Sequence, residues 1–171
     1  MEIISAEDMR KMAVKNADIK SLLQTGYRDV MGITKDKFLN HEFVKKNAYL
    51  VPKDFEDNPT FFSAFFVDKI YLVARLIFVK EDHRGNGHGK QLIDWFKDNL
   101  SLFGTEAIQI GVLYSNNPNF EKLDKYYSSQ GFKRTKSAFD HGNNNYYHDY
   151  FWSDKDFTVF NVLHNVGVNF N

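Results

Sequence analysis

Hydrophobic side chains recur near the start of the chain at the spacing of one helical face. The spaced positions are Ile19, Leu22, Leu23, Tyr27 and Val30. Ser5, followed three residues later by Asp8, is a capping signal for an earlier helix start. Together these patterns predict that residues 6–46 are mostly helical.

Aromatic and β-branched residues then form runs that are typical of strands. Residues 48–51 make a short run that stops at Pro52. Residues 61–67 and 70–79 make two longer runs, and the pair Asp68 and Lys69 between them resembles a tight turn. This region is therefore predicted to contain an antiparallel hairpin.

The second half of the chain alternates between strand and helix patterns. One helical face carries Leu92, Ile93, Phe96, Leu100 and Phe103, and Gly104 is the candidate C-cap. Residues 107–114 are predicted to form a strand, with Asn117 as N-cap and Pro118 as first residue of a helix ending near Gln130. Gly131 closes that helix, and residues 132–139 are expected to form a strand. Residues 142–145 are expected to form the turn that leads to a last strand, which ends at Trp152. This order predicts a mixed α/β or α+β sheet.

Composition narrows the class of protein. The 171 residues suit a single domain, and 22 basic against 22 acidic side chains create no overall field for nucleic acid or an anionic membrane. No apolar run approaches the roughly 20 residues of a membrane span, and the N-terminus lacks a signal-peptide pattern, so a cytoplasmic protein is expected. With no cysteine and no histidine pair at a convincing spacing, no metal site is predicted.

A glycine-rich segment carries the most specific chemistry. Arg84-Gly85-Asn86-Gly87-His88-Gly89-Lys90 follows a predicted strand and opens a predicted helix, where main-chain N–H groups and the helix dipole favour an anion. A Walker loop requires glycine at position 84 and serine or threonine at 91, where Arg84 and Gln91 stand. A dinucleotide loop requires glycine at position 90, which is lysine. Both alternatives fail, and a ligand-free glycine turn is the remaining structural interpretation.

The spacing Arg84-x-x-Gly87-x-Gly89 resembles the acetyl-CoA signature of the GNAT superfamily of N-acetyltransferases. A second element of that family, Tyr127-x-x-x-Gly131-Phe132, follows about 40 residues later. The resemblance covers residues 61–152 and implies a mostly antiparallel central sheet flanked by helices. Residues 1–60 then correspond to variable N-terminal helices, and residues 153–171 to an edge strand or a homodimer contact.

The resemblance also implies roles for individual residues. Amides of the glycine loop bind the pyrophosphate of acetyl-CoA, Lys90 adds charge, and asparagines ahead of the later helix contact the pantetheine arm. The implied coenzyme contacts are Ile77, Phe78, Val79, Arg84, Gly85, Asn86, Gly87, His88, Gly89, Lys90, Asn117, Asn119 and Tyr127. Within the loop, His88 is expected to be a solvent-facing spacer. Tyr127 is the implied general acid, because a phenol of pKa about 10 can protonate a thiolate of pKa about 8.5.

Two positions depart from the family pattern. Many members carry a glutamate on the strand before the loop, yet residues 70–78 contain no carboxylate and have Arg75 instead. Deprotonating a lysine-like amine at pH 7 costs about 4.6 kcal/mol, so a base or a water chain is needed. Glu81, Asp82 and His83 are candidates. Seven residues before Tyr127, where the family often has asparagine, stands Phe120.

The acceptor side is expected to include the last hairpin. Its polar and aromatic residues are Asp140, His141, Tyr146, Tyr147, His148 and Asp149. Carboxylates among aromatic rings suit a cationic amine, and a purely structural hairpin is the alternative.

Three functions follow from these patterns. The first is an enzyme that transfers the acetyl group of acetyl-CoA to an amine of a small molecule or protein. The second is a non-catalytic acyl-CoA sensor, which would explain the missing strand carboxylate. The third is an interaction protein that uses its aromatic strands and tail, with a merely structural glycine loop.

Overall fold

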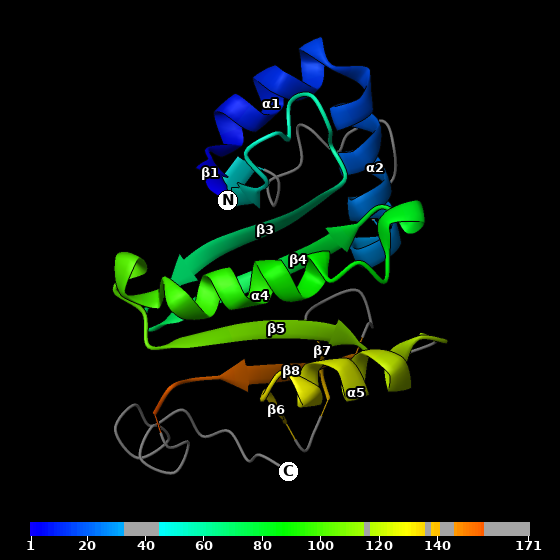
Figure 1. Ribbon diagram of the computed structural model, residues 1–171. Helices are drawn as coiled ribbons and strands as arrows, with labels where there is room; N and C mark the ends of the chain where they lie inside the picture. Colours follow the sequence, from blue (N-terminus) through cyan, green and yellow to red (C-terminus); the bar gives the residue numbers. More distant parts are fainter. Residues whose placement is uncertain (33–44, 115–116, 136–137, 141–145, 156–171) are drawn as a thin grey trace. The chain divides into compact units, whose positions relative to one another are not determined.

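The computed structural model describes residues 1–32, 45–114, 117–135, 138–140 and 146–155 (Figure 1). Its helices are α1 (Ala6–Lys15), α2 (Ala17–Met31), α4 (His88–Asp98) and α5 (Phe120–Ser129). Its strands are β1 (Glu2–Ile4), β2 (Ala48–Val51), β3 (Phe61–Asp68), β4 (Tyr71–Val79), β5 (Ala107–Leu113), β6 (Lys133–Arg134), β7 (Phe139–Asp140) and β8 (Tyr146–Trp152). None of the helices in these ranges is long and apolar enough to span a membrane.

The chain divides into two compact units, and the strands β3 and β4 each contribute residues to both of them. Unit 1 comprises residues 1–66 and 74–98, and unit 2 comprises residues 67–73 and 99–171.

Unit 1 is an antiparallel sheet with helices packed on it. Its strands are ordered β1, β2, β3, β4, and Lys69, with a φ of 55°, makes the turn between β3 and β4. One face packs against α1 and α2, where Tyr27, Tyr49 and Phe62 are fully buried in one hydrophobic cluster. The other face of β3 receives α4, since the rings of Phe65 and Phe96 lie 5.1 Å apart.

Unit 2 mixes one parallel and several antiparallel pairings. Residues 71–73 of β4 run parallel to residues 107–109 of β5, and β5 pairs antiparallel with the whole of β8. Strands β6 and β7 both pair antiparallel with β8. Helix α5 packs on β8 through Tyr127 and Tyr150, whose ring centroids are 5.5 Å apart. The predicted mixed, mostly antiparallel sheet is confirmed.

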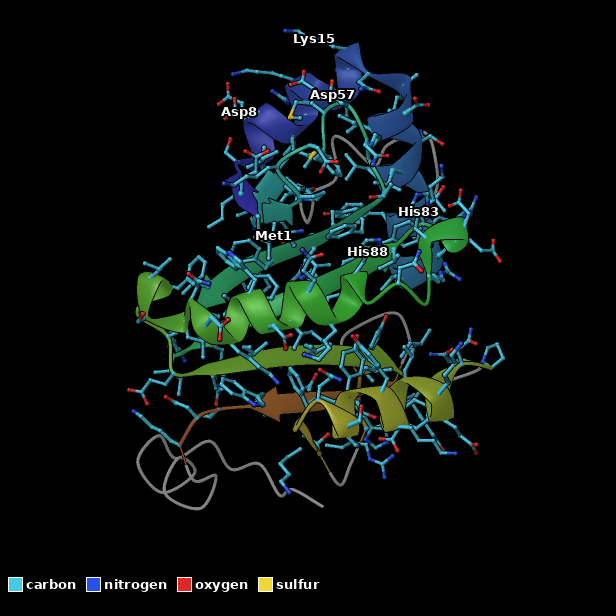
Figure 2. All side chains as sticks on the ribbon, in the orientation of Figure 1. Met1, Asp8, Lys15, Asp57, His83 and His88 are labelled. Carbon is cyan, nitrogen blue, oxygen red and sulfur yellow. The ribbon has the colours of Figure 1, made fainter. Side chains whose placement is uncertain are left out.

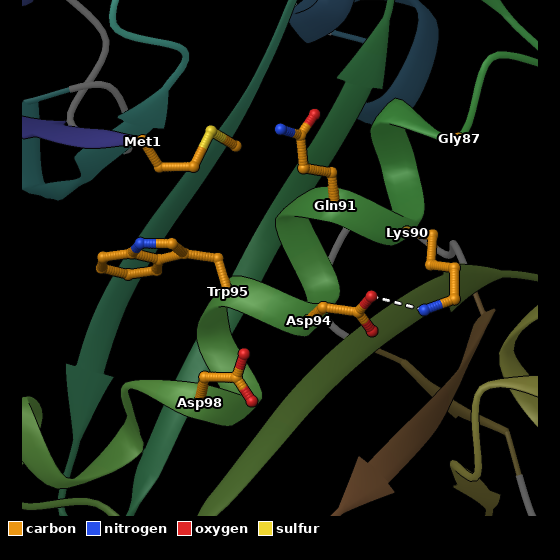
Figure 3. Close-up of a pocket in the computed structure, with 7 residues that line it drawn as sticks. All are labelled: Met1, Gly87, Lys90, Gln91, Asp94, Trp95 and Asp98. Carbon is orange, nitrogen blue, oxygen red and sulfur yellow. Dashed lines mark hydrogen bonds and ion pairs between the residues drawn. The ribbon is translucent and has the colours of Figure 1, made fainter.

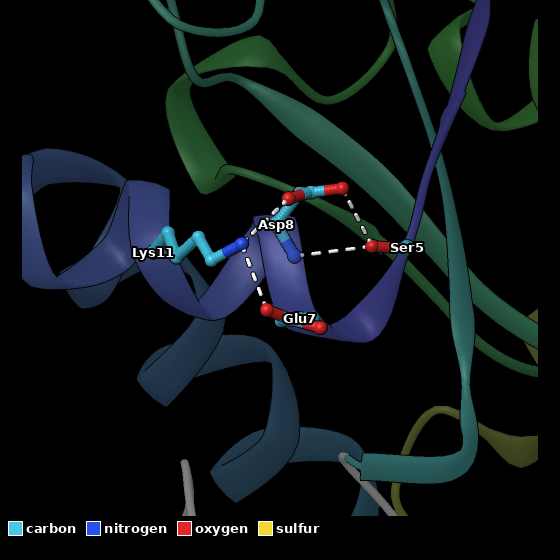
Figure 4. Close-up of polar contacts among 4 residues, drawn as sticks. All are labelled: Ser5, Glu7, Asp8 and Lys11. Carbon is cyan, nitrogen blue, oxygen red and sulfur yellow. Dashed lines mark hydrogen bonds and ion pairs between the residues drawn. The ribbon is translucent and has the colours of Figure 1, made fainter.

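The predicted cap of the first helix is also confirmed. The Ser5 hydroxyl accepts a hydrogen bond from the Asp8 amide at 3.1 Å and donates one to the Asp8 carboxylate at 2.8 Å (Figure 4). Lys11 then bridges Glu7 and Asp8 on the exposed side of the helix. The hydroxyl satisfies one of the amides that a helix start leaves without a partner.

Several predicted boundaries are wrong. Helix α4 ends at Asp98, because the segment up to Phe103 tightens into a 3₁₀ turn that Gly104 closes with a φ of 63°. The single strand predicted over 132–139 is two short strands, β6 and β7. Strand β1 was not predicted, since three residues carry too little periodicity. The turn at 142–145 and most of the tail, 156–171, lie outside the described residues.

Candidate active site

Strand β4 places the glycine loop at its carboxyl end. Phe78 is buried in the α1/α2 core, whereas Ile77 and Val79 on the other face are half-buried. The Lys80 amide donates to the Thr60 carbonyl at 2.9 Å, which ties the strand end to the segment preceding β3. Any ligand contact of Phe78 therefore has to use its main chain, because its side chain belongs to the core.

A 3₁₀ turn and an arginine shape the entry to the loop. The turn spans Glu81–His83, and the Arg84 amide donates to the Glu81 carbonyl at 3.2 Å. The Arg84 Nε also donates to the Val79 carbonyl at 3.1 Å. The guanidinium thus folds back on the strand end and fixes the start of the loop, while the residue stays exposed.

Two of the three glycine positions in the loop require a residue without a side chain. Gly85 and Gly87 have φ values of 87° and 82°, in the left-handed region that residues with a Cβ avoid. Gly89 is not among the residues with positive φ and lies in the first turn of α4. Among these three glycines, left-handed backbone is confined to Gly85 and Gly87, because the place of Gly89 in the helix sets its φ.

The loop feeds directly into a helix N-terminus. The first helical hydrogen bond of α4 runs from the Gln91 amide to the Gly87 carbonyl at 2.9 Å. The amides of residues 88–90 therefore have no partner within the helix. Residues 84–87 are exposed, so an anion can reach these amides and the positive end of the helix dipole.

His88 is a stacking residue, which corrects the expectation of a solvent-facing spacer. Its ring lies 4.4 Å from that of Phe61, with an interplanar angle of 16°, and is half-buried. The ring centroid of His83 lies 6.4 Å from that of His88 (Figure 2). Phe61 on β3 thereby supports the start of α4. The 26 residues that separate Phe61 from His88 in the sequence hide this contact from any local pattern.

Lys90 is already paired within its helix. Its ammonium binds the Asp94 carboxylate one turn further on (Figure 3). This pair borders a groove of about 480 Å³ whose lining residues are Met1, Gly87, Lys90, Gln91, Asp94, Trp95 and Asp98. Asp94 and Asp98 make the groove unfavourable for phosphate, so an anion is better placed on the amides ahead of the helix than along its outer face.

In unit 2, α5 presents Tyr127 from its buried face. The side chain is 7% exposed, and its ring contacts those of Tyr126, Phe132 and Tyr150 at centroid distances of 5.3, 5.8 and 5.5 Å. The predicted orientation toward the sheet is confirmed. Burial raises the pKa of Tyr127, so the phenol remains in its proton-donating form at neutral pH.

The Tyr127 hydroxyl differs from those of Tyr27, Tyr49 and Tyr150, the other described tyrosines whose whole side chain is buried. It makes no hydrogen bond within the described ranges. The Tyr150 hydroxyl, in contrast, donates to Asp124 at 2.6 Å. A core tyrosine normally satisfies its hydroxyl, so the open hydroxyl of Tyr127 favours a chemical role over a packing role.

The segment before α5 corrects the predicted N-cap. Helix α5 begins at Phe120, and the Asn117 oxygen accepts from the Asn119 amide at 3.0 Å in a local turn. The Asn117 amide group also donates to the Leu113 carbonyl at 2.8 Å. Asn117 therefore shapes the β5–α5 connection, while Asn119 occupies the N-cap position without a side-chain cap bond and is exposed.

The predicted base candidates lie in the 3₁₀ turn after β4. Glu81 and Asp82 are exposed, and the His83 Nδ1 lies 2.8 Å from Asp82. This contact lowers the pKa of Asp82. On β4 itself the Arg75 guanidinium lies 4.6 Å from the centre of the Phe66 ring. Of the predicted acceptor-side residues, the Asp140 side chain and His141 lie outside the description. In the described ranges, no group of three or more potential metal ligands converges.

Comparison with known protein families identifies the fold. Residues 50–134 match the acetyltransferase (GNAT) domain. The chain contains a GNAT acetyltransferase domain. The matched span holds both the glycine loop and the Tyr127-x-x-x-Gly131-Phe132 element, so the predicted resemblance is confirmed. Among curated proteins, none matches the chain.

Solved structures agree on this fold. A Lactobacillus plantarum protein assigned as an N-acetyltransferase has a TM-score of 0.62 at 18% identity, covering 89% of this chain and 97% of its own. An aminoglycoside 6'-N-acetyltransferase complexed with coenzyme A has a TM-score of 0.59 at 14% identity, covering 91% and 98%. A Salmonella typhimurium protein assigned as an acetyltransferase, solved with acetyl-CoA, has a TM-score of 0.57 at 15% identity, covering 91% and 95%. At these identities the similarity establishes the GNAT fold.

Proposed function

We propose that this GNAT domain is an N-acetyltransferase that uses acetyl-CoA as cosubstrate and an amine as acceptor. The observation that carries the proposal is the exposed loop in which Gly85 and Gly87 adopt positive φ directly before the N-terminus of α4. Such a loop presents several amides and the helix dipole to one anion, as a coenzyme pyrophosphate requires. Two of the similar structures contain coenzyme A or acetyl-CoA, which supports the choice of ligand.

The coenzyme contacts proposed for unit 1 are mainly main-chain groups. The amides of residues 85–90 bind the pyrophosphate, and the main chain of residues 77–79 at the end of β4 binds the pantetheine arm. Arg84 holds the loop start through its bond to the Val79 carbonyl. Lys90 contributes charge only after exchanging Asp94 for a phosphate oxygen. In unit 2, Asn119 is the better candidate for a pantetheine contact, because the Asn117 side chain is committed to its own turn.

The proposed chemistry is direct attack of the amine on the thioester. The nitrogen forms a bond to the acetyl carbon, the carbon–sulfur bond breaks, and the coenzyme leaves as a thiolate. Tyr127 donates its proton to that thiolate. Its open hydroxyl and its buried, protonated phenol support this role. A positioned acid of this kind is typically worth about 10² to 10⁴ in rate.

Calorimetric titration with acetyl-CoA tests the coenzyme site. Gly87→Arg places a side chain where the loop must approach the pyrophosphate, so affinity is expected to fall by about 100-fold or more. Gly104→Arg is the matched control, because Gly104 also has positive φ and open space around its missing side chain. Both variants carry about 1–2 kcal/mol of backbone strain. Only Gly87→Arg is expected to lose binding.

A screen of primary amines, read by release of free coenzyme A thiol, then tests turnover. Acetylated amine with equimolar thiol supports the proposal. Binding without turnover across the screen would instead identify a non-catalytic acyl-CoA sensor. An absence of heat with both acetyl-CoA and free coenzyme A would overturn the coenzyme site altogether.

A further inference from the structure

Within the described residues, the phenol of Tyr127 is held in place by contacts of its ring. Its hydroxyl makes no hydrogen bond to any of these residues. Three aromatic rings lie next to its own, those of Tyr126, Phe132 and Tyr150, at centroid distances of 5.3, 5.8 and 5.5 Å. The direction in which Tyr127 presents its hydroxyl therefore depends on how firmly these neighbouring rings are themselves held.

Of the three neighbours, Tyr150 is the one that comes from another element of unit 2. Tyr126 precedes Tyr127 in α5, and the Phe132 amide donates to the Tyr127 carbonyl at 3.1 Å, so both belong to the end of the same helix. Tyr150 lies on β8, is fully buried, and donates its hydroxyl hydrogen to the Asp124 Oδ1 at 2.6 Å. Its ring is thus fixed by packing at one end and by a hydrogen bond at the other.

The acceptor of that hydrogen bond joins three elements. Asp124 lies on α5, three residues before Tyr127, so its carboxylate moves with the helix that carries the phenol. The Arg134 Nη1 lies 3.3 Å from the same Asp124 oxygen. Arg134 on β6 is also the register partner of Tyr150 on β8. Helix α5 and the strands β8 and β6 therefore meet at one carboxylate oxygen, which sets where the Tyr150 ring lies against Tyr127 (Figure 1).

The hydrogen bond between Tyr150 and Asp124 persists at neutral pH. Burial raises the pKa of Tyr150, the hydrogen bond to Asp124 adds to that effect, and Arg134 acts in the opposite direction. The phenol therefore keeps its proton, and a carboxylate can only accept it in a hydrogen bond. Bonds to an ionised acceptor are roughly twice as strong as those between neutral groups. The Tyr150 hydroxyl is consequently committed to Asp124, in contrast to that of Tyr127.

From these contacts we infer that Tyr150 is a positioning residue for the general acid Tyr127. The hydrogen bond to Asp124 fixes the Tyr150 ring, and that ring sets the direction of the Tyr127 phenol. The inference rests on the proposed function, in which Tyr127 protonates the departing thiolate, and it concerns residues of unit 2 alone. Tyr150 itself transfers no proton. Misplacing a reacting group by about 1 Å can cost about 10²-fold in rate, so a fixed phenol matters for the transfer step.

The first test requires neither coenzyme nor acceptor. Carbon-13 relaxation dispersion on the tyrosine-labelled protein measures how fast the Tyr127 ring flips, and Tyr127→Phe identifies its signals. Tyr150→Phe keeps the neighbouring ring and removes its hydrogen bond, so the flip rate of Tyr127 is expected to rise about tenfold. Tyr71→Phe is the matched control, because its ring contacts Phe151, at 5.6 Å, and not Tyr127. An unchanged flip rate in Tyr150→Phe, or an equal rise in the control, overturns the inference.

The second test is a double-mutant cycle on acetyl transfer from acetyl-CoA to the primary amine that the screen selects. Tyr150→Phe is expected to lower kcat by about tenfold and to leave the KM for acetyl-CoA unchanged. In the Tyr127→Phe background the same substitution should change kcat by less than about twofold, because the group through which Tyr150 acts is gone. Equal losses in both backgrounds would show that Tyr150 has a merely structural role.

Variants of Asp124 supply the rescue. Asp124→Asn keeps an oxygen that accepts from the Tyr150 hydroxyl, so kcat should stay within about threefold of native, whereas Asp124→Ala should match the loss in Tyr150→Phe. Native affinity for acetyl-CoA in calorimetry shows that each variant is folded. Native kcat in Tyr150→Phe, in a protein whose transfer requires Tyr127, overturns the inference alone. A native protein without acetyl transfer overturns the proposed function as well.

Discussion

Tyr27 in unit 1 and Tyr127 in unit 2 are both buried on the inner face of a helix, yet their hydroxyls differ in hydrogen bonding. The Tyr27 hydroxyl lies 2.8 Å from that of Tyr49 and accepts from the Asn47 amide at 3.0 Å. The Tyr127 hydroxyl has no hydrogen bond in the described ranges. Burial alone therefore does not separate a structural tyrosine from a chemical one. We expect the state of the hydroxyl to distinguish Tyr27 from Tyr127, because a group held for a ligand cannot also be committed to the core.

The largest expected effect comes from removing the open hydroxyl. Tyr127→Phe keeps the ring among its three aromatic neighbours and should lower kcat for acetyl transfer by about 10² to 10⁴. Affinity for acetyl-CoA and the free energy of unfolding should stay close to native, since no hydrogen bond is lost. Steady-state kinetics with calorimetry and urea denaturation check this. Full activity in Tyr127→Phe would show that another group protonates the thiolate.

The same substitution in unit 1 should have the opposite profile. Tyr27→Phe removes the hydroxyl that joins Tyr49 and Asn47, and Asn47 is only 3% exposed. Leaving such buried groups without that partner costs about 1–3 kcal/mol of unfolding free energy. Urea denaturation measures the loss, and kcat should remain native. A loss of kcat with unchanged stability would reverse the distinction between the two tyrosines.

A smaller effect separates two glycines of one loop. Gly85→Ala places a Cβ in the left-handed region, where nothing else lies within 4 Å, so backbone strain alone should cost about 1–2 kcal/mol. Gly89→Ala lies within α4 and should be neutral or stabilising by up to about 1 kcal/mol. Urea denaturation of both variants without ligand checks the difference. Equal destabilisation would contradict the helical placement of Gly89.

The smallest expected effect concerns a third kind of hydroxyl, the helix cap. Ser5→Ala leaves the Asp8 amide without its cap and should lower the free energy of unfolding by about 1 kcal/mol. It should also raise the pKa of Asp8, which the Ser5 hydroxyl now lowers. Ser101→Ala, at an exposed serine whose hydroxyl makes no hydrogen bond within the described part of the chain, should stay within about 0.5 kcal/mol of native. Thermal unfolding and a carboxylate NMR titration measure the two effects.

Local patterns in the sequence were sufficient for most of the fold. The helical face containing Leu22 and Tyr27, the hairpin of β3 and β4, and the glycine loop before α4 were all predicted correctly. Each depends on residues close to one another in the chain, whose periodicity or backbone preference specifies the element. The family also followed from two short motifs. Errors occurred where the local signal was weak or ambiguous: at β1, at the start of α5, and in the segment divided between β6 and β7.

The properties on which the proposed function depends come from contacts between distant residues. His88 and Tyr127 were recognisable as members of motifs, but the stacking of His88 on Phe61 and the open hydroxyl of Tyr127 depend on packing between elements. Sequence by itself determined which side chains and backbone conformations are available. Tertiary structure alone decided which polar atoms are satisfied and which stay open, because hydrogen bonding and desolvation act through space and not along the chain.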